Sequence, residues 1–193
     1  MKSIVVFCGS GTGIDPRFLE IAKETGRFLA NKKITVIYGG AKVGLMGAVA
    51  DGALEKNGKV IGIIPNFLSS KEIVHENLTE LIMVKTMHER KLLMHELSEG
   101  VIALPGGFGT MEELFEMLTW AQLGLHQKPI GILNFLQYYD SLLNLSDTMT
   151  EQGFLKPSYR KMLVDASSLE ELFDKLVNYK SIPSEILLTA QNT

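Results

Sequence analysis

The residues best suited to chemistry are two adjacent carboxylates, Glu112 and Glu113, which follow the glycine-rich segment 105–110, PGGFGT. The apolar run at 101–104 before this segment predicts a buried strand, and residues 114–120 after it predict a helix. A glycine-rich turn between a strand and a helix N-terminus binds anions, because glycine lets the backbone approach closely and the helix presents free N–H groups. We therefore predict a phosphate site here, with the two carboxylates placed to act on whatever the phosphate carries.

The same residues have a purely structural interpretation. Thr110-x-x-Glu113 matches a capping box, in which Glu113 would accept a hydrogen bond from the N–H of the capping residue. Acidic residues in a first helical turn are also common because they complement the helix dipole. The pattern alone leaves both interpretations of Glu113 open. The three glycines favour the anion site, since an ordinary strand-to-helix turn needs only one.

Arg90 is the second candidate for chemistry. It lies near the start of a predicted helix at 86–99, in the segment 87–91, MHERK. Helical spacing places it on the same face as Leu93 and Leu97, which predicts that its guanidinium points inward near the functional edge of the fold. A solvated arginine and a structural ion pair are the alternatives that remain open.

Two more glycine-rich turns each follow a predicted strand. One carries Gly9 and Ser10, and the other carries Gly39, Gly40 and Gly44. Neither matches a common nucleotide motif, because the Gly-x-Gly-x-x-Gly pattern is broken at Ile14 and no acidic residue ends the second strand. Gly44 is followed by leucine and not by the lysine of a phosphate-binding P-loop. Three such turns in one chain still favour a phosphorylated small molecule.

Short apolar runs alternate with helical patterns along the chain. Strands are predicted at 4–8, 34–38, 60–64, 81–84, 101–104 and 129–133, and a helix is predicted over 135–150. This alternation predicts a Rossmann-like α/β fold: a doubly wound parallel sheet in three layers. We expect one domain over 1–193, with a weakly structured tail after about residue 180. All three glycine turns then fall at the carboxyl ends of the strands, where such folds bind ligands.

Bulk composition excludes several classes of protein. The net charge is −3 and there is no long basic run, which argues against nucleic acid as a partner. No apolar run approaches the ~18 residues of a membrane span. The single cysteine, Cys8, fits a reducing compartment, and a cytoplasmic location follows as the expectation. His88 and His95 lack further ligands at metal-site spacing, so no metal is expected.

The segments 105–113, 87–91 and 38–47 (YGGAKVGLMG) together resemble one known family. It is the LOG type of cytokinin riboside 5′-monophosphate phosphoribohydrolases, whose members have often been labelled lysine decarboxylases. The resemblance implies a Rossmann-like homodimer that hydrolyses the N-glycosidic bond of an adenosine-type 5′-monophosphate. The products would be the free base and ribose 5-phosphate, with no metal or organic cofactor.

The resemblance also implies roles for individual residues. Arg90 and Glu113 correspond to the catalytic pair. Substrate-binding positions fall on Gly106, Gly107, Gly109 and Thr110 of the phosphate loop, and on Glu72, Lys91, Glu112 and Thr119. Ala41 departs from the family pattern, in which many members have a glycine.

Two other functions stay open beside this one. The chain could be a non-catalytic carrier of a nucleotide or a nucleotide-like cofactor. A pyridoxal phosphate enzyme would need a Schiff-base lysine, for which Lys91 and Lys42 are candidates by position only. The two carboxylates beside the anion loop favour the hydrolase.

Overall fold

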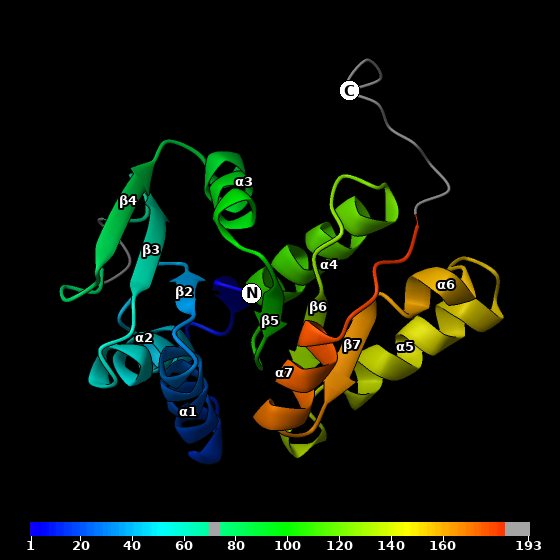
Figure 1. Cartoon of the computed structure of the whole chain (residues 1–193), viewed down its shortest axis with the longest axis horizontal. Coiled ribbons are helices and arrows are strands. Elements are labelled where there is room, and N and C mark those ends of the chain that lie inside the picture. Colours follow the sequence, from blue (N-terminus) through cyan, green and yellow to red (C-terminus); the bar gives the residue numbers. More distant parts are fainter. Residues whose placement is uncertain (70–73, 184–193) are drawn as a thin grey trace.

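The alternating pattern folds into a parallel sheet, shown in Figure 1, in a computed structural model that describes residues 1–69 and 74–183. Within these residues the sheet has seven strands in the order β4-β3-β2-β1-β5-β6-β7. The strands are β1 Ser3–Phe7, β2 Thr35–Tyr38, β3 Val60–Pro65, β4 Glu80–Val84, β5 Val101–Ala103, β6 Ile130–Leu133 and β7 Leu163–Ala166. The predicted α/β fold with a parallel sheet is confirmed.

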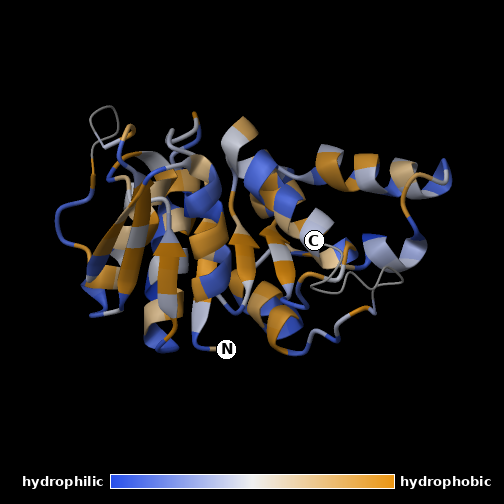
Figure 2. Cartoon of the chain, turned by 90° about the horizontal axis from the view of Figure 1, so that it is seen from above, coloured by the Kyte–Doolittle hydropathy of each residue, from blue (hydrophilic) through white to orange (hydrophobic). Residues whose placement is uncertain are grey.

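Helices cover both faces of the sheet and give three layers (Figure 2). One face packs against α1 (Arg17–Asn31), α2 (Gly44–Glu55) and α7 (Leu169–Val177). The other packs against α3 (Met87–Leu97), α4 (Phe108–Gln122), α5 (Asp140–Glu151) and α6 (Pro157–Arg160). Side chains of β1 alternate between these two cores, Ile4 and Val6 toward the first, Val5 and Phe7 toward the second. This period of two is what a strand buried on both faces requires.

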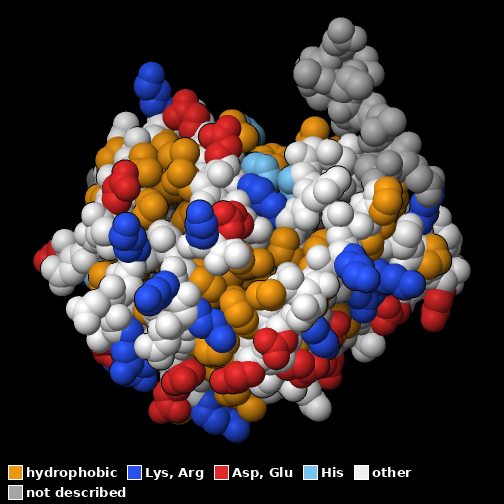
Figure 3. Space-filling model, in the orientation of Figure 1, with side chains coloured by type: hydrophobic (Ala, Val, Ile, Leu, Met, Phe, Trp, Pro, Cys, Tyr) orange, Lys and Arg blue, Asp and Glu red, His pale blue; other side chains and the backbone are white. Residues whose placement is uncertain are grey.

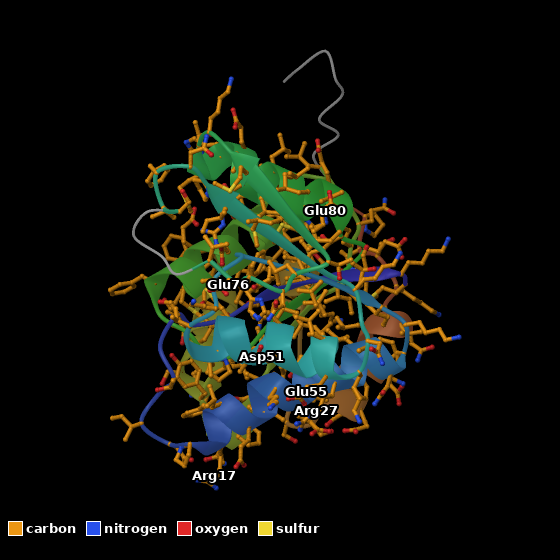
Figure 4. All side chains as sticks on the ribbon, turned by 90° about the vertical axis from the view of Figure 1, so that its left-hand side faces the viewer. Arg17, Arg27, Asp51, Glu55, Glu76 and Glu80 are labelled. Atoms are coloured by element: carbon orange, nitrogen blue, oxygen red, sulfur yellow. The ribbon has the colours of Figure 1, made fainter. Side chains whose placement is uncertain are left out.

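Charged side chains lie on the outer surfaces of the helices. Arg27 of α1 donates to Glu55 of α2 at 2.7 Å, and Figure 4 shows the two beside each other. On the face in Figure 3, acidic and basic side chains are interspersed. None of the helices in the described part of the chain has the length and apolar character needed to cross a membrane.

The chain departs from the predicted elements after β6. The helix expected over 135–150 is broken into a 3₁₀ turn, η1 (Phe135–Gln137), and α5. Leu136 and Gln137 both have positive φ, at 53° and 60°, which is incompatible with a continuous right-handed helix. Strand β7 and helix α6 were not predicted. Strand β7 is a four-residue edge strand with two half-buried positions, so its sequence shows no clear alternation of apolar and polar residues. Helix α6 is only four residues long.

The sheet positions the functional loops at its switch point. Strand β1 pairs with β2 on one side and with β5 on the other, so the connections from β1 and β5 leave in opposite directions. Their loops meet at the carboxyl ends, where Gly9 N donates to Pro105 O at 3.1 Å. Open α/β sheets bind ligands at this point.

Candidate active site

A cavity of about 350 Å³ opens where the loops after β1, β2 and β5 meet the first turns of α3 and α4. It brings together residues that are far apart in the sequence. Predicted site residues in its lining are Gly9, Ser10, Gly39, Arg90, Gly107, Gly109, Thr110, Glu112 and Glu113. The cavity therefore joins the glycine loop, the arginine and the carboxylates in one place.

Helix α4 begins at Phe108, three residues earlier than it would if Thr110 were its N-cap. Gly107 is the N-cap residue, with extended backbone and no side-chain capping bond. The first bond within the helix runs from Met111 N to Gly107 O, at 3.1 Å. Helix geometry therefore leaves the N–H groups of the first turn available to an anion. The capping-box interpretation of Glu113 is wrong, because glycine starts the helix and places Glu113 beyond its first turn.

The glycines of this loop have different roles. A Cβ on Gly106 would collide with the buried side chain of Thr110 and would lie 2.8 Å from Gly9 N. Glycine is thus required for the two loops to approach each other. By contrast, no described atom lies within 4 Å of where a Cβ would stand on Gly107 or Gly109. These two glycines keep the backbone open to a ligand.

Arg90 is held by α3, whose start Thr86 caps by accepting from Glu89 N at 3.1 Å, as predicted. Its side chain is only 6% exposed, so it is not a solvated arginine. Nη2 donates to Gly39 O at 3.3 Å, while Nε has no hydrogen-bond partner among the described residues. A Cβ on Gly39 would overlap Nη2, so glycine there makes room for the guanidinium.

The buried face of α3 differs from the predicted one. Arg90 and Met94, four residues apart, are its buried side chains, whereas Leu97 is exposed. Of the two neighbours used to predict the inward direction of Arg90, Leu93 is half-buried against the core as expected, and only Leu97 was wrong. Among the described residues, no carboxylate forms an ion pair with it. A buried guanidinium with an unused N–H is costly unless something binds it, which marks Arg90 as a ligand-binding group.

Glu113 lines the same cavity and is half-buried. Burial raises its pKa to about 7; Arg90 opposes this rise and Glu112 adds to it. A carboxyl group that titrates near neutral pH is suited to acid–base chemistry and is typical of functional sites. The sequence pattern located Glu113 but gave no sign of this pKa.

Lys91 takes part in an ion-pair network instead of lining the cavity. Its Nζ donates to Glu112 Oε1 at 2.5 Å and to Glu116 Oε1 at 2.9 Å, and its side chain is 9% exposed. Burial alone would lower the pKa of Lys91, but the hydrogen bonds to the two carboxylates outweigh it and the pKa is raised. A lysine held protonated in this way is a poor Schiff-base nucleophile. Lys42, the other candidate, is paired with Glu76 at 2.9 Å.

Comparison with known proteins identifies the family of this chain. A family model described as "Possible lysine decarboxylase" matches residues 46–176. The cytokinin riboside 5′-monophosphate phosphoribohydrolase LOG5 of Arabidopsis thaliana is 44% identical over 96% of this chain and 82% of its own length. The phosphoribohydrolase of the same name from Rhodococcoides fascians is 45% identical over 88% of this chain and 86% of its own. The chain belongs to this phosphoribohydrolase family.

Solved structures with the same fold include carriers. A molybdenum cofactor binding protein of Rippkaea orientalis has a TM-score of 0.68 and 25% identity, covering 92% of this chain and 99% of its own. The molybdenum cofactor carrier protein of Chlamydomonas reinhardtii, at 18% identity and TM-score 0.66 over 93% of this chain and 100% of its own, shares the fold. The much higher identity to the phosphoribohydrolases leaves the carrier hypothesis with less support.

Three further residues expected at the site, Thr119, Gly40 and Gly44, lie outside the main cavity. Thr119 is on α4, donates to Phe115 O at 2.7 Å, and lines a separate cavity beside α5 and α6. Gly40 and Gly44 do not line the main cavity. Glu72 lies outside the described residues.

The loop at Gly44 is one of the three glycine turns that together favoured a phosphorylated ligand, and the start of the helix after it is bonded within the protein. Leu45 N donates to Gly9 O at 3.1 Å and to Gly11 O at 3.2 Å. The N-terminal N–H groups of α2 are therefore used to hold the first glycine loop. Gly44 has a φ of 59°, and a Cβ there would collide with Ser10 O. This glycine loop therefore holds the loop after β1 in place at the edge of the main cavity.

Several cavity residues were not predicted as such. Met46, Leu68, Met87, Met94 and Phe108 add apolar surface. Phe108 is 96% exposed, and an aromatic residue inside a glycine loop was the available signal. Cys8 also lines the cavity; it is buried, as predicted, and burial raises its pKa far above the usual range, which disfavours the reactive thiolate. No group of three metal-binding side chains lies within the described ranges.

Proposed function

We propose that this protein hydrolyses the N-glycosidic bond of adenosine-type nucleoside 5′-monophosphates, plain or N6-modified. Water supplies oxygen to C1′ of the ribose and a proton to the departing base, so the products are ribose 5-phosphate and the free base. The observation that carries this proposal is Glu113, whose pKa is raised to about 7 in a cavity that also holds Arg90 and the first turn of α4.

The chemistry follows from where charge develops. As the C1′–N9 bond breaks, the ribose ring becomes positive and the base becomes negative. The carboxylate of Glu113 stabilises the ring and accepts a proton from the attacking water. Arg90, with its unused Nε, stabilises negative charge on the base or the phosphate.

The phosphate loop contributes binding energy away from the reacting bond. The N–H groups at the start of α4 and the Thr110 hydroxyl anchor the 5′-phosphate, which fixes C1′ relative to Glu113. Glu112, at the cavity rim and bound to Lys91, contacts the ribose side of the substrate. We propose no resident metal or organic cofactor, because this hydrolysis needs a carboxylate, a cation and water.

Two wider properties belong to the same proposal. The protein forms a homodimer through the helices that carry Arg90 and Trp120, where Leu92, Phe115 and Leu125 expose apolar side chains. Thr119 and Glu72 would act as substrate-binding residues in that dimer, the role that the resemblance to the family implies for them. The protein acts in the cytoplasm on a small nucleotide, with neither nucleic acid nor membrane as partner.

The deciding experiment is to incubate the pure protein with AMP and an N6-substituted AMP and to quantify free base and ribose 5-phosphate. Stoichiometric release of both products, with many turnovers per protein, supports the hydrolase. Tight binding without release would support the carrier instead. The unphosphorylated riboside is the matched control, because it keeps the bond but lacks the anchor.

A further inference from the structure

Two consecutive tyrosines, Tyr138 and Tyr139, donate hydrogen bonds to backbone carbonyls of the segment that contains the phosphate loop. The Tyr138 hydroxyl donates to Gly106 O at 2.7 Å, and the Tyr139 hydroxyl donates to Leu104 O at 2.6 Å. Both acceptors lie in the connection from β5 to α4. Tyr139 is 1% exposed, whereas Tyr138 is 44% exposed. Tyr139 is therefore a core residue, while the hydroxyl of Tyr138 reaches from the surface to the loop.

The 3₁₀ turn η1, which directly precedes these tyrosines, has a strained backbone. Leu136 and Gln137, with φ of 53° and 60°, lie in the left-handed region that residues other than glycine rarely adopt. Such a conformation costs roughly 1–3 kcal/mol per residue and persists where the surroundings impose it. Asn134 imposes it here, because its Oδ1 accepts from Tyr139 N and its Nδ2 donates to Asp140 Oδ1, both at 2.8 Å. The fold keeps a strained turn next to the anion loop.

The bond to Gly106 O determines which way the next N–H points. In a trans peptide the C=O and N–H groups point in opposite directions. Because Gly106 O points toward Tyr138, the N–H of Gly107 points away from it. Gly107 lies between two cavities: it lines the main cavity with Arg90 and Glu113, and it also lines a smaller cavity of about 200 Å³ behind the loop, together with Gly106 and Tyr138. The Tyr138 bond thus turns the Gly107 N–H away from Tyr138, on the side of the peptide opposite the tyrosine hydroxyl.

The smaller cavity explains why the loop needs this bond. Its walls include Gly9, Thr12, Phe18 and Tyr138, so open space lies behind the Gly106–Gly107 peptide. Glycines on both sides of a peptide unit allow its plane to flip through changes in the flanking ψ and φ angles, while the peptide bond itself stays trans. Edge-on packing against Phe18 at 5.8 Å and Tyr139 at 5.0 Å fixes the Tyr138 ring. A fixed hydroxyl then restrains this peptide from the side of the smaller cavity.

We propose that Tyr138 is a positioning residue for recognition of the 5′-phosphate: its hydroxyl orients the Gly106–Gly107 peptide so that the anion loop is preorganised before substrate binds. This inference rests on the proposed function. Tyr138 does not contact the substrate. Loss of its hydroxyl should therefore lower the affinity for the 5′-phosphate and leave Arg90 and Glu113 in place.

Tyr138→Phe is the variant that tests this, since it removes the hydroxyl and keeps the ring packing. Tyr139→Phe is the matched control, because it removes a hydroxyl that binds the same connection but does not bind the Gly106–Gly107 peptide. For each protein, kcat and KM are measured with the nucleoside 5′-monophosphate and with the unphosphorylated riboside. The affinity for ribose 5-phosphate, and for inorganic phosphate, is measured by calorimetry without any turnover.

Tyr138→Phe should raise KM for the nucleotide and Kd for ribose 5-phosphate by a common factor of about three to ten, the range expected for one lost hydrogen bond. Its kcat/KM for the riboside should match wild type. Tyr139→Phe should lower Tm and leave the nucleotide-to-riboside preference unchanged. Wild-type phosphate affinity in Tyr138→Phe, or an equal loss on nucleotide and riboside, would overturn the inference. A wild-type protein that binds the nucleoside 5′-monophosphate without releasing free base would rule out the hydrolase, yet the calorimetric comparison with ribose 5-phosphate would still decide the role of Tyr138.

Discussion

Arg90 of α3 and Glu113 of α4 line one cavity, and Arg90 acts on the pKa of Glu113 although the described contacts include no ion pair between them. Burial raises the pKa of Glu113 to about 7, and the positive charge of Arg90 limits that rise. Gly39, from a third segment, makes room for the guanidinium. A carboxyl group near its pKa beside a permanent cation gives the site both an acid–base group and a fixed positive charge, as glycosidic hydrolysis requires.

The first prediction uses Gly39 to displace Arg90 without changing it. Gly39→Ala places a methyl group on the position of Arg90 Nη2, so the guanidinium must move. We expect kcat/KM to fall by at least ~10-fold, since misplacement of a charged group by about 1 Å can cost 10²-fold. Arg90→Ala should lose still more activity with little change in Tm. Steady-state kinetics and thermal unfolding check both variants.

Gly11→Ala is the control for that substitution, because no described atom lies within 4 Å of its Cβ position. It should behave as wild type. If Arg90→Ala fails to fold, Arg90 is a structural group and the catalytic assignment is wrong.

The second prediction concerns assembly. The homodimer proposed above should appear in light scattering at micromolar protein, and Phe115→Glu, a charge placed on an exposed apolar position of α4, should shift it toward monomer. Glu20→Lys, an exposed change on α1, should leave the mass unchanged. A wild-type monomer under these conditions contradicts the dimer.

The third prediction is a pH dependence that separates activity from stability. Catalysis through the ionised form of Glu113 should make kcat/KM rise with pH and level off above about 7. Stability should fall as pH rises. The folded state binds the Glu113 proton more tightly than the unfolded chain, in which this carboxyl group has its ordinary pKa of about 4.5. The contribution of protonated Glu113 to the free energy of unfolding is therefore complete below pH 4.5 and is lost as pH rises to about 7.

The measurement is a pair of profiles, kcat/KM and Tm against pH, for wild type and Glu113→Gln. The variant has no group to titrate here, so its Tm should lack the decrease that Glu113 causes between pH 4.5 and 7. Parallel Tm profiles for the two proteins would show that the pKa of Glu113 is not raised.

Much of the fold follows from local sequence, but the site depends on contacts that local sequence does not encode. The strands and most helices are periodic, and the loop at 105–110 lies where its glycines indicate. The supporting role of Gly44 was hidden, because it comes from the bond between Leu45 N and Gly9 O. The break at Leu136 was hidden for the same reason, since the tyrosines after it bind carbonyls more than 30 residues away.

The pKa of Glu113 is another property of the assembled molecule. The pattern of residues 110–113 allowed a capping role, and only the start of α4 at Phe108 excludes it. The burial that raises the pKa comes from packing of α3, α4 and the ends of the strands around one carboxyl group. The periodicity of the sequence does not predict this burial.

The last prediction is that Glu113→Gln abolishes most turnover while the fold and phosphate binding survive. Gln keeps the size of the side chain and removes the negative charge that faces the developing positive charge at C1′. We expect kcat to fall by a factor on the order of 10² or more, the loss typical of one preorganised electrostatic group. Affinity for ribose 5-phosphate should change little, because the N–H groups of α4 are intact.

Glu116→Gln is the matched control, since Glu116 lies on the same helix and binds Lys91 at 2.9 Å. That substitution removes an equal charge about one turn away and should leave kcat within about twofold of wild type, because Glu116 does not line the cavity. Single-turnover rates with excess enzyme place the loss in the chemical step. A Glu113→Gln protein with wild-type turnover would remove Glu113 from the catalytic mechanism and leave its raised pKa as a consequence of burial alone.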